Sequence, residues 1–548
     1  MTRRDKLVVL ALIGLFVVAS AAAVVTDPAD HPAQATFGGT YVEGVAGVPQ
    51  YLDPLIAATN VDQDVSRLVF TGLTRFDRDG TIVPDLAAHF EVDPAGTHWT
   101  FSIRSDAFWH DAVPVTAADV VYTVGLLQDK SYVGPYAEAF RGVTVQPVDS
   151  KVVRFTLPDA YAPFAGSTTV PLLPAHLLRG IAFGDLARQP FNQRPVGTGP
   201  FKVSEVDGRQ VTLVASDDFY RTRPVRARAY LDKIVLRFYR DSGEALAALA
   251  RGEIDATSGL SPQDAGRART LKNVDLFSLP TNDLTALFLN VRPTKAVFRD
   301  RVVRQAIAAA IDRGKVLQVA TDGRGSVSDE FVPSSSWAFV RDVPRYSYSV
   351  AEARAQLDAA DWKDHDGDGV RDKGGTVLRF SISTSDEPAR VAAARQIADD
   401  LTNIGMKVEV RVVPFVVLVD RVARTRDFDA LLVGITIGSD PDPYAFFHSS
   451  QVGDPGDNFS GYSTLAMDRL LEQARRTVDQ SARRDLFAQV FKALVTDVPV
   501  VFLYTSDYLY VQSHTLKGLK IAPINDPTQR FWNVEDWYIK TAVLPDTR

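Results

Sequence analysis

The sequence contains no cysteine among its 548 residues. It can therefore form no disulfide bond, no cysteine-ligated metal site and no thiol-dependent active site. A lipid anchor attached to an N-terminal cysteine is excluded for the same reason, so we do not expect a lipoprotein.

The sequence also has few histidines and no excess of positive charge. The eight histidines are scattered, and none of them falls in the H-E-x-x-H pattern of a zinc enzyme. The net charge is −7, so no basic field predicts binding to nucleic acid. The glycine-containing stretch GTGP at 197–200 lacks the G-x-x-x-x-G-K-S/T pattern of a phosphate loop and predicts a tight bend instead. We expect no obligatory cofactor.

A long apolar run is present at the N-terminus. Residues 7–25 are apolar, follow the basic segment MTRRDK, and include small residues at 19–23 that suit a cleavage site. This pattern predicts a secretion signal. The run is also just long enough to span a bilayer, so an uncleaved anchor is the alternative. In either case the rest of the chain lies outside the cytoplasmic membrane.

The remaining sequence mixes strand and helix patterns. It is longer than the chain that one hydrophobic core usually stabilises. Thr116 is placed to cap a helix with Asp119 at its third position. A strand is expected over 285–291 and one amphipathic helix over 299–313. Beyond 284 helices and strands alternate, which predicts a largely parallel sheet. Two unlike halves without a catalytic cluster indicate an α/β fold of two lobes with a cleft between them.

Six segments, in order along the chain, resemble one family. They are FSIRSDAFWHDAVPVTAADVVYTV at 101–124, RPVGTGPFKV at 194–203, LFLNVRPTKAVFRDRVVRQAIAAAIDR at 287–313, YSYSVAEARAQLDAADWKDHDGDGVRDK at 346–373, GSDPDPYAFFHSS at 438–450 and NFSGYSTLAMDRLLEQAR at 458–475. Together they resemble the family 5 extracellular solute-binding proteins, the peptide-, dipeptide- and nickel-type receptors of ABC importers. Ala112 stands where the family usually has glycine.

This resemblance implies a large type II periplasmic-binding-protein fold, in which an extra subdomain interrupts the first lobe. The N-terminal signal or anchor and its linker would occupy 1–35. The core of lobe I would comprise 38–76, 195–282 and 502–538, the subdomain 77–194, and lobe II 283–501.

The same resemblance implies a function. The protein would bind a solute, most simply an oligopeptide or dipeptide, and deliver it as a monomer to a membrane permease driven by a cytoplasmic ATPase. A non-peptide cargo, such as an oligosaccharide or a metal chelate, is the first alternative. A secreted hydrolase using carboxylates such as Asp440 and Asp442, and a membrane-tethered sensor or chaperone, are two others.

The segment DALLVGITIGSDPDPY supplies most of the candidate cleft residues, because ligands bind beyond the carboxyl ends of strands in open α/β sheets. The expected ligand-binding residues are Asn60, Trp337, Thr436, Ile437, Gly438, Asp440, Asp442 and Tyr444. Each has a simpler interpretation: Asp440 and Asp442 as turn residues before proline, Asn60 as part of a helix entry, and Trp337 as core packing.

One of these positions departs from the family pattern. The dipeptide-type receptors carry an aspartate for the peptide's amino group three residues before the D-P-D motif, and that position is Ile437 here. Asp440 or Asp442 could substitute for it. The departure weakens the assignment of a peptide cargo.

The stretch DHDGDGVRDKGG resembles a calcium-binding loop. Counted from Asp364, carboxylates follow at Asp366, Asp368 and Asp372, which are positions 3, 5 and 9. Position 12 is Gly375, so the usual bidentate glutamate is missing. The loop predicts either a structural Ca²⁺ site or a polar turn, and in both cases a stabilising rather than a functional role.

Overall fold

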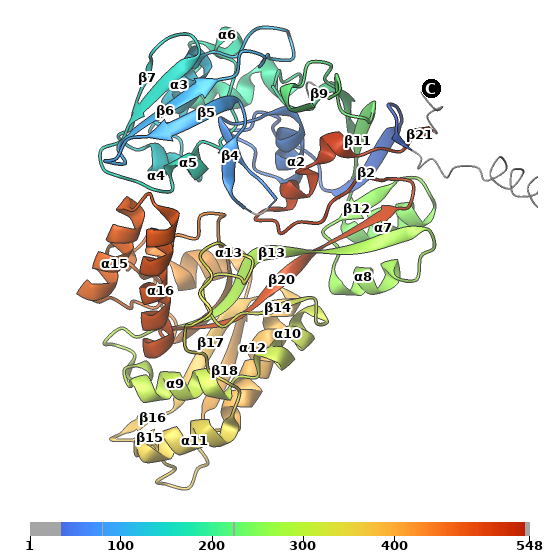
Figure 1. Ribbon diagram of the computed structural model, residues 1–548. Helices are drawn as coiled ribbons and strands as arrows, with labels where there is room; N and C mark the ends of the chain where they lie inside the picture. The colour runs from blue at the N-terminus through green and yellow to red at the C-terminus, as the bar shows by residue number, and fades with distance from the viewer. Residues whose placement is uncertain (1–33, 79, 223–224, 543–548) are drawn as a thin grey trace, which may run out of the picture.

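The computed structural model describes residues 34–78, 80–222 and 225–542. Two long strands, β13 (Val274–Leu289) and β20 (Val500–Ser513), pair antiparallel and run from one lobe into the other (Figure 1). Lobe I lies above and lobe II below in this view, and the predicted N-terminal signal lies outside the described residues.

A mixed sheet extends through both lobes in the order β18-β17-β19-β13-β20-β12-β2-β11-β10-β9, with β14 added beside β20. The lobe II strands are β14 (Gly325–Val327), β17 (Arg379–Ser385), β18 (Lys407–Val413) and β19 (Ala430–Thr436). The lobe I strands are β2 (Thr40–Ala46), β9 (Phe201–Val206), β10 (Gln210–Ala215), β11 (Lys233–Tyr239) and β12 (Ala256–Ser258).

The prediction of a largely parallel sheet in the second half is wrong. β17 pairs parallel with β18 and β19, but β19 pairs antiparallel with β13, and β13 pairs antiparallel with β20. Strand β13 also begins at Val274, well before the expected residue 285, because its first half pairs with β20 inside lobe I.

Helices cover both faces of the lobe II sheet. On one face lie α9 (Arg301–Ala310), α10 (Arg313–Thr321), α11 (Val350–Ala359) and α12 (Pro388–Thr402); on the other lie α15 (Leu465–Arg476) and α16 (Gln480–Asp497). The single helix expected over 299–313 is two helices. The first ends at Ala310, and the Asp312 carboxylate then caps α10 by accepting from the Lys315 N–H at 3.0 Å.

Lobe I is completed by α2 (Asn60–Val69), α7 (Ser242–Ala250) and α8 (Pro262–Ala268). Its subdomain, at upper left in Figure 1, has a four-stranded antiparallel sheet in the order β5-β6-β8-β7. The subdomain elements are β5 (Ala87–Val92), β6 (His98–Ile103), β7 (Thr144–Pro147), β8 (Val152–Thr156), α3 (Ala117–Leu127), α4 (Ala137–Phe140), α5 (Phe164–Ser167) and α6 (Ala175–Leu178).

Short elements connect these layers. The strands are β1 (Gln34–Ala35), β3 (Thr74–Phe76), β4 (Ile82–Pro84), β15 (Asp372–Lys373), β16 (Thr376–Val377) and β21 (Thr541–Ala542). The helical turns are η1 (Phe183–Arg188), η2 (Pro190–Asn192), η3 (Tyr220–Thr222), η4 (Ala296–Phe298), α13 (Phe415–Val417), η5 (Leu418–Ala423), α14 (Tyr444–Phe447), η6 (Ser449–Gln451), η7 (Pro527–Phe531) and η8 (Val534–Asp536).

Two local predictions are confirmed. Thr116 and Asp119 form the expected reciprocal cap of α3, with the Asp119 carboxylate accepting from the Thr116 N–H at 2.8 Å. The GTGP bend is structural: side chains at Gly197 or Gly199 would overlap backbone carbonyls at the end of α2. Of the helices in residues 34–542, as far as the structure describes them, none has both the length and the apolarity needed to cross a membrane.

Candidate binding site in lobe II

A cavity of about 430 Å³ opens where two parallel strands of lobe II separate. β17 and β19 pair at two positions, Ile382 with Ala430 and Ser383 with Leu431. Beyond these pairs both strands continue to their carboxyl ends, and the cavity lies between them. This is the place at which open α/β sheets bind ligands.

The cavity has apolar walls and charged groups. Its apolar lining includes Phe415, Leu418, Val419, Leu432, Phe446 and Phe459, and its charged lining includes Glu387, Arg390, Arg424, Arg426, Asp454 and Asp457. A site of this composition suits an amphipathic ligand, because apolar contacts provide affinity and a few polar groups fix its orientation.

Arg390, in the first turn of α12, is held across three strands. Its guanidinium donates to the Thr285 hydroxyl on β13 and, at 3.4 Å, to the Tyr504 hydroxyl on β20. It crosses β19 at Gly434, where a methyl group would overlap the guanidinium. Its one acidic partner is the exposed Glu387 carboxylate, at 3.5 Å, among the residues described. The remaining N–H groups can bind a ligand carboxylate.

The predicted residues at the end of β19 point in two directions. Thr436 and Gly438 are exposed, whereas the Ile437 side chain is buried in the core of lobe II. The Thr436 hydroxyl donates to Asp283 at 2.6 Å, and the Ile437 N–H donates to the Asn282 carbonyl at 3.0 Å. The ligand-binding roles of Thr436, Ile437 and Gly438 stay predictions. Because its side chain is buried, Ile437 could contact a ligand only through its backbone.

Asp440 and Asp442 form ion pairs inside lobe II. Asp440 accepts two hydrogen bonds from Arg483 of α16, and Asp442 accepts one from Arg475 of α15 at 2.5 Å. Burial raises the pKa of Asp440, and Arg483 opposes that rise. Asp442 also accepts from the Tyr444 N–H at 3.1 Å, which confirms its predicted turn role. Their ligand roles stay predictions, and loss of Asp440 would also leave the buried Arg483 unpaired.

Tyr444 packs against α15, and Trp337 packs against α16. The Arg475 guanidinium lies 3.6 Å from the centroid of the Tyr444 ring. The Trp337 ring is half-buried, with its centroid 5.8 Å from that of Phe487. Direct ligand contact by either ring stays a prediction.

On the lobe I side, exposed Asn60 begins α2 directly after a rigid loop. The buried Asp62 carboxylate fixes this loop by accepting from the N–H groups of Gln50, Tyr51, Ala58 and Thr59, at distances from 2.7 to 3.3 Å. Asn60 is therefore presented from a fixed position, and its ligand role stays a prediction.

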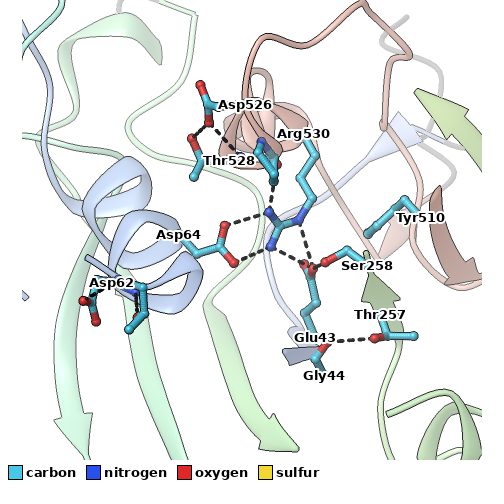
Figure 2. Close-up of polar contacts among 12 residues, drawn as sticks. Glu43, Gly44, Asp62, Asp64, Thr257, Ser258, Tyr510, Asp526, Thr528 and Arg530 are labelled. Atoms are coloured by element: carbon cyan, nitrogen blue, oxygen red, sulfur yellow. Dashed lines mark hydrogen bonds and ion pairs between the residues drawn. The ribbon is translucent and has the colours of Figure 1, made fainter. Parts of the chain in front are cut away.

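A buried ion cluster fixes the position of α2 (Figure 2). Arg530 of η7 donates two hydrogen bonds to the Asp64 carboxylate of α2, both at 2.7 Å, and a third to Glu43 of β2 at 2.9 Å. Ser258 of β12 also donates to Glu43, at 3.0 Å. The cluster thus joins the three separate chain segments of lobe I.

A second cavity, of about 320 Å³, lies between the subdomain and lobe II. Its lining includes Tyr161 from the subdomain and Arg475 from α15. The Ala162 N–H donates to the Arg475 carbonyl at 2.7 Å beside it. This cavity lies at a contact between the subdomain and lobe II, away from the carboxyl ends of β17 and β19.

The acidic loop lies at the far end of lobe II from lobe I, near β15 and β16 at the bottom of Figure 1. Carboxylate oxygens of Asp364, Asp366 and Asp368 all lie within 4.8 Å of one another and are exposed. Asp372 instead approaches His365, at 3.2 Å. Three hard oxygen donors fit a calcium ion, and calcium binding stays a prediction.

The sequence-based choice of site residues did not include Arg390. The carboxyl-end rule, applied to the strand at 379–385 as it was to the one at 430–436, would have indicated Arg390.

Comparisons with known proteins agree with this architecture. The family described as bacterial extracellular solute-binding proteins, family 5 Middle, matches residues 81–458. The oligopeptide-binding protein AppA of Bacillus subtilis is 28% identical over 92% of both chains. Its structure in complex with a nonapeptide covers 92% of this chain and 100% of that chain, with 27% identity and a TM-score of 0.71. NikZ from Campylobacter jejuni, in complex with Ni(L-His), covers 91% and 99%, with 26% identity and a TM-score of 0.73. The predicted two-lobed fold is confirmed.

Proposed function

Because this chain belongs to family 5 of the bacterial extracellular solute-binding proteins, we propose that its cargo is a short peptide, which it delivers unchanged to an ABC permease. Its general role is to bind a solute outside the cytoplasm. The peptide assignment is supported by the similarity to AppA, which carries a nonapeptide in its structure. The family consists of binding proteins, so the cargo leaves the protein chemically intact.

Arg390 carries the proposal. A half-buried guanidinium, fixed by Thr285 and Tyr504, faces a cavity with apolar walls. The carboxylate of a peptide would accept from its free N–H groups, and the adjacent side chain would enter the space between Phe415 and Phe446. Charge-assisted hydrogen bonds of this kind are among the strongest polar contacts in proteins.

Capture and release follow from the two-lobed structure. A cargo that contacts both lobes only when they close stabilises the closed state by that difference in contact. Hinge closure is the established motion of periplasmic binding proteins as a class. Opening of the lobes at the permease would remove these contacts and release the cargo.

Substitution of Arg390 tests the carboxylate site. We expect Arg390→Gln to weaken binding of alanyl-phenylalanine about tenfold to a hundredfold, because a hydrogen bond to a charged group contributes about 1.5–3 kcal/mol. Alanyl-phenylalanine amide, which lacks the carboxylate, should bind both proteins equally weakly. Calorimetric titration measures both affinities.

The matched control is Arg395→Gln, an exposed arginine on the same helix that does not line the cavity. It should leave affinity unchanged. A screen of sugars and of Ni–histidine by thermal shift completes the test. Tight binding of one of these, with no peptide bound at millimolar concentration, would replace the proposed cargo.

The route out of the cell is part of the proposal. The apolar N-terminus would direct export, and either its cleavage or its retention as an anchor would set the final location. Mass spectrometry of the mature N-terminus in membrane and soluble fractions distinguishes the two. An intact residue 7–25 segment in the membrane fraction would identify an anchor.

A further inference from the structure

The two ends of the described chain meet on one side of lobe I. β1 pairs antiparallel with β21, with Gln34 opposite Ala542, and β21 lies at the right edge of lobe I in Figure 1. The Thr36 N–H donates to the Lys540 carbonyl at 3.0 Å, which continues this contact by one residue. The N-terminal segment that precedes residue 34 is therefore joined to the protein on this side.

A row of aromatic side chains lies beside the paired ends. The ring centroids of Phe37 and Tyr230 are 5.4 Å apart, and those of Tyr230 and Tyr538 are 6.1 Å apart. Phe37 is 45% exposed, and the two tyrosines are half-buried. Val225 is 84% exposed and directly precedes Arg226, whose guanidinium lies 4.5 Å from the centroid of the Tyr230 ring. Exposed apolar groups beside amphipathic rings suit the interfacial region of a bilayer.

Positive charges border the aromatic row. Lys517 lies opposite Tyr538 in an antiparallel bridge, so their side chains project from the same side. Lys517 and Lys540 are exposed, and neither forms an ion pair with any residue that the structure describes. Arg226 and Arg228 are already paired with aspartates. The two lysines are therefore available to anionic groups outside the protein.

We call this part of lobe I the terminal face and define it as residues 36–38, 225–230, 517–521 and 538–540. The linker between the apolar run at 7–25 and β1 consists of residues 26–33. Such a linker spans at most about 30 Å when fully extended. If the apolar run stays in the membrane, the terminal face is held close to the bilayer at a high effective concentration. Lipid is thus the partner that the chain itself brings to this face.

We propose that the terminal face binds the anionic lipid surface of the membrane that holds the N-terminal segment. Val225 and the aromatic row would lie at headgroup level, and Lys517 and Lys540 would face the lipid phosphates. Apolar burial and attraction to anionic lipid add together in binding of this kind. The inference is independent of the cargo, and it rests on the part of the proposed function in which residues 7–25 are retained as an anchor.

Lipid quenching of a single fluorophore tests this contact. Because the sequence has no cysteine, the label can be attached at Val225→Cys alone. The full chain is inserted into vesicles of phosphatidylglycerol and phosphatidylcholine that carry a nitroxide-labelled lipid. We expect the label to be quenched, and the quenching to fall as salt is added, because salt screens the attraction. Val133→Cys, which is 91% exposed in the subdomain, is the matched control and should stay unquenched.

Lysine substitutions test the role of charge. Lys517→Gln and Lys540→Gln should each lower the ratio of quenched to unquenched protein about fivefold, because each removes one positive charge close to an anionic surface. Lys130→Gln, which changes an exposed lysine of the subdomain, should leave the ratio unchanged. Vesicles of phosphatidylcholine alone should also reduce the quenching.

Three results would overturn the inference. The first is equal quenching, or none, at Val225→Cys and Val133→Cys. The second is a dimer that shields the label at Val225→Cys without lipid, since it would assign the terminal face to a second copy of the chain. The third is isolation of the protein from cells only as a chain without residues 7–25, which would remove the anchor and leave the proposed cargo unaffected.

Discussion

Ala112 occupies a backbone conformation that suits glycine. Its φ is +68°, in the left-handed region, where an L-residue is disfavoured by about 1–2 kcal/mol. The family resemblance already marked this position, because related sequences usually have glycine there. The sequence therefore identified the site, and the structure supplies the physical reason.

We expect Ala112→Gly to raise the free energy of unfolding by about 1 kcal/mol, since relief of this strain outweighs the added freedom of glycine in the unfolded chain. Urea denaturation measures the change. Ala355→Gly is the control: Ala355 is also exposed but lies inside α11, so glycine should lower stability there. A loss of stability in Ala112→Gly would contradict the strain argument.

Asp53 makes stability depend on pH. Burial raises its pKa to about 7, although one oxygen accepts from the Leu55 N–H at 2.9 Å. The folded state therefore holds a proton that the unfolded state releases near pH 4. Its contribution to stability is complete below pH 4 and is lost as the pH rises through 7, by at most roughly 4 kcal/mol.

Asp53→Asn should flatten this dependence, because asparagine imitates the protonated acid. Denaturant titrations between pH 4 and 8 measure the slope, and exposed Asp217→Asn should leave it unchanged. A variant with the wild-type slope would show that Asp53 is not the group responsible.

Among the elements, those with strong local signals were predictable. The cap of α3 depends on residues three apart, so Thr116 and Asp119 alone identify it. Strand pairing depends on partners far apart in the chain. The full length of β13 and its antiparallel neighbours therefore could not be derived from Pro280 and the alternating residues after it.

The buried ion cluster links separate elements of lobe I. Arg530→Met should lower the free energy of unfolding by about 3–5 kcal/mol, because Asp64 and Glu43 would remain buried without their cation. Urea denaturation measures the loss. Arg188→Met, which removes an exposed pair with Asp185, should have no measurable effect. Equal effects of the two variants would indicate that the cluster is replaceable.

At the scale of the whole molecule, the subdomain reaches lobe II directly. Tyr161 faces Arg475, whose guanidinium lies 5.8 Å from the centroid of the Tyr161 ring and 3.6 Å from that of Tyr444. The Ala162 N–H completes the contact. These groups belong to different parts of the chain, so their contacts depend on how far the lobes are closed.

Tyr161→Ala should therefore weaken cargo binding severalfold without altering the cavity at the strand ends, because the closed state loses a stabilising contact. Calorimetry measures affinity, and small-angle scattering should show a larger radius of gyration for the cargo-bound variant. Tyr348→Ala, an exposed tyrosine of lobe II, is the control. Unchanged affinity and dimensions in Tyr161→Ala would remove this contact from the closing mechanism.

The two strands shared by the lobes have one more consequence. β13 and β20 contribute side chains to the cores of both lobes. We therefore expect that neither lobe folds when it is expressed alone. A fragment that ended at residue 282 would lack the C-terminal strand that completes its own sheet. Such halves should become folded only when expressed together, as complementing fragments of one protein.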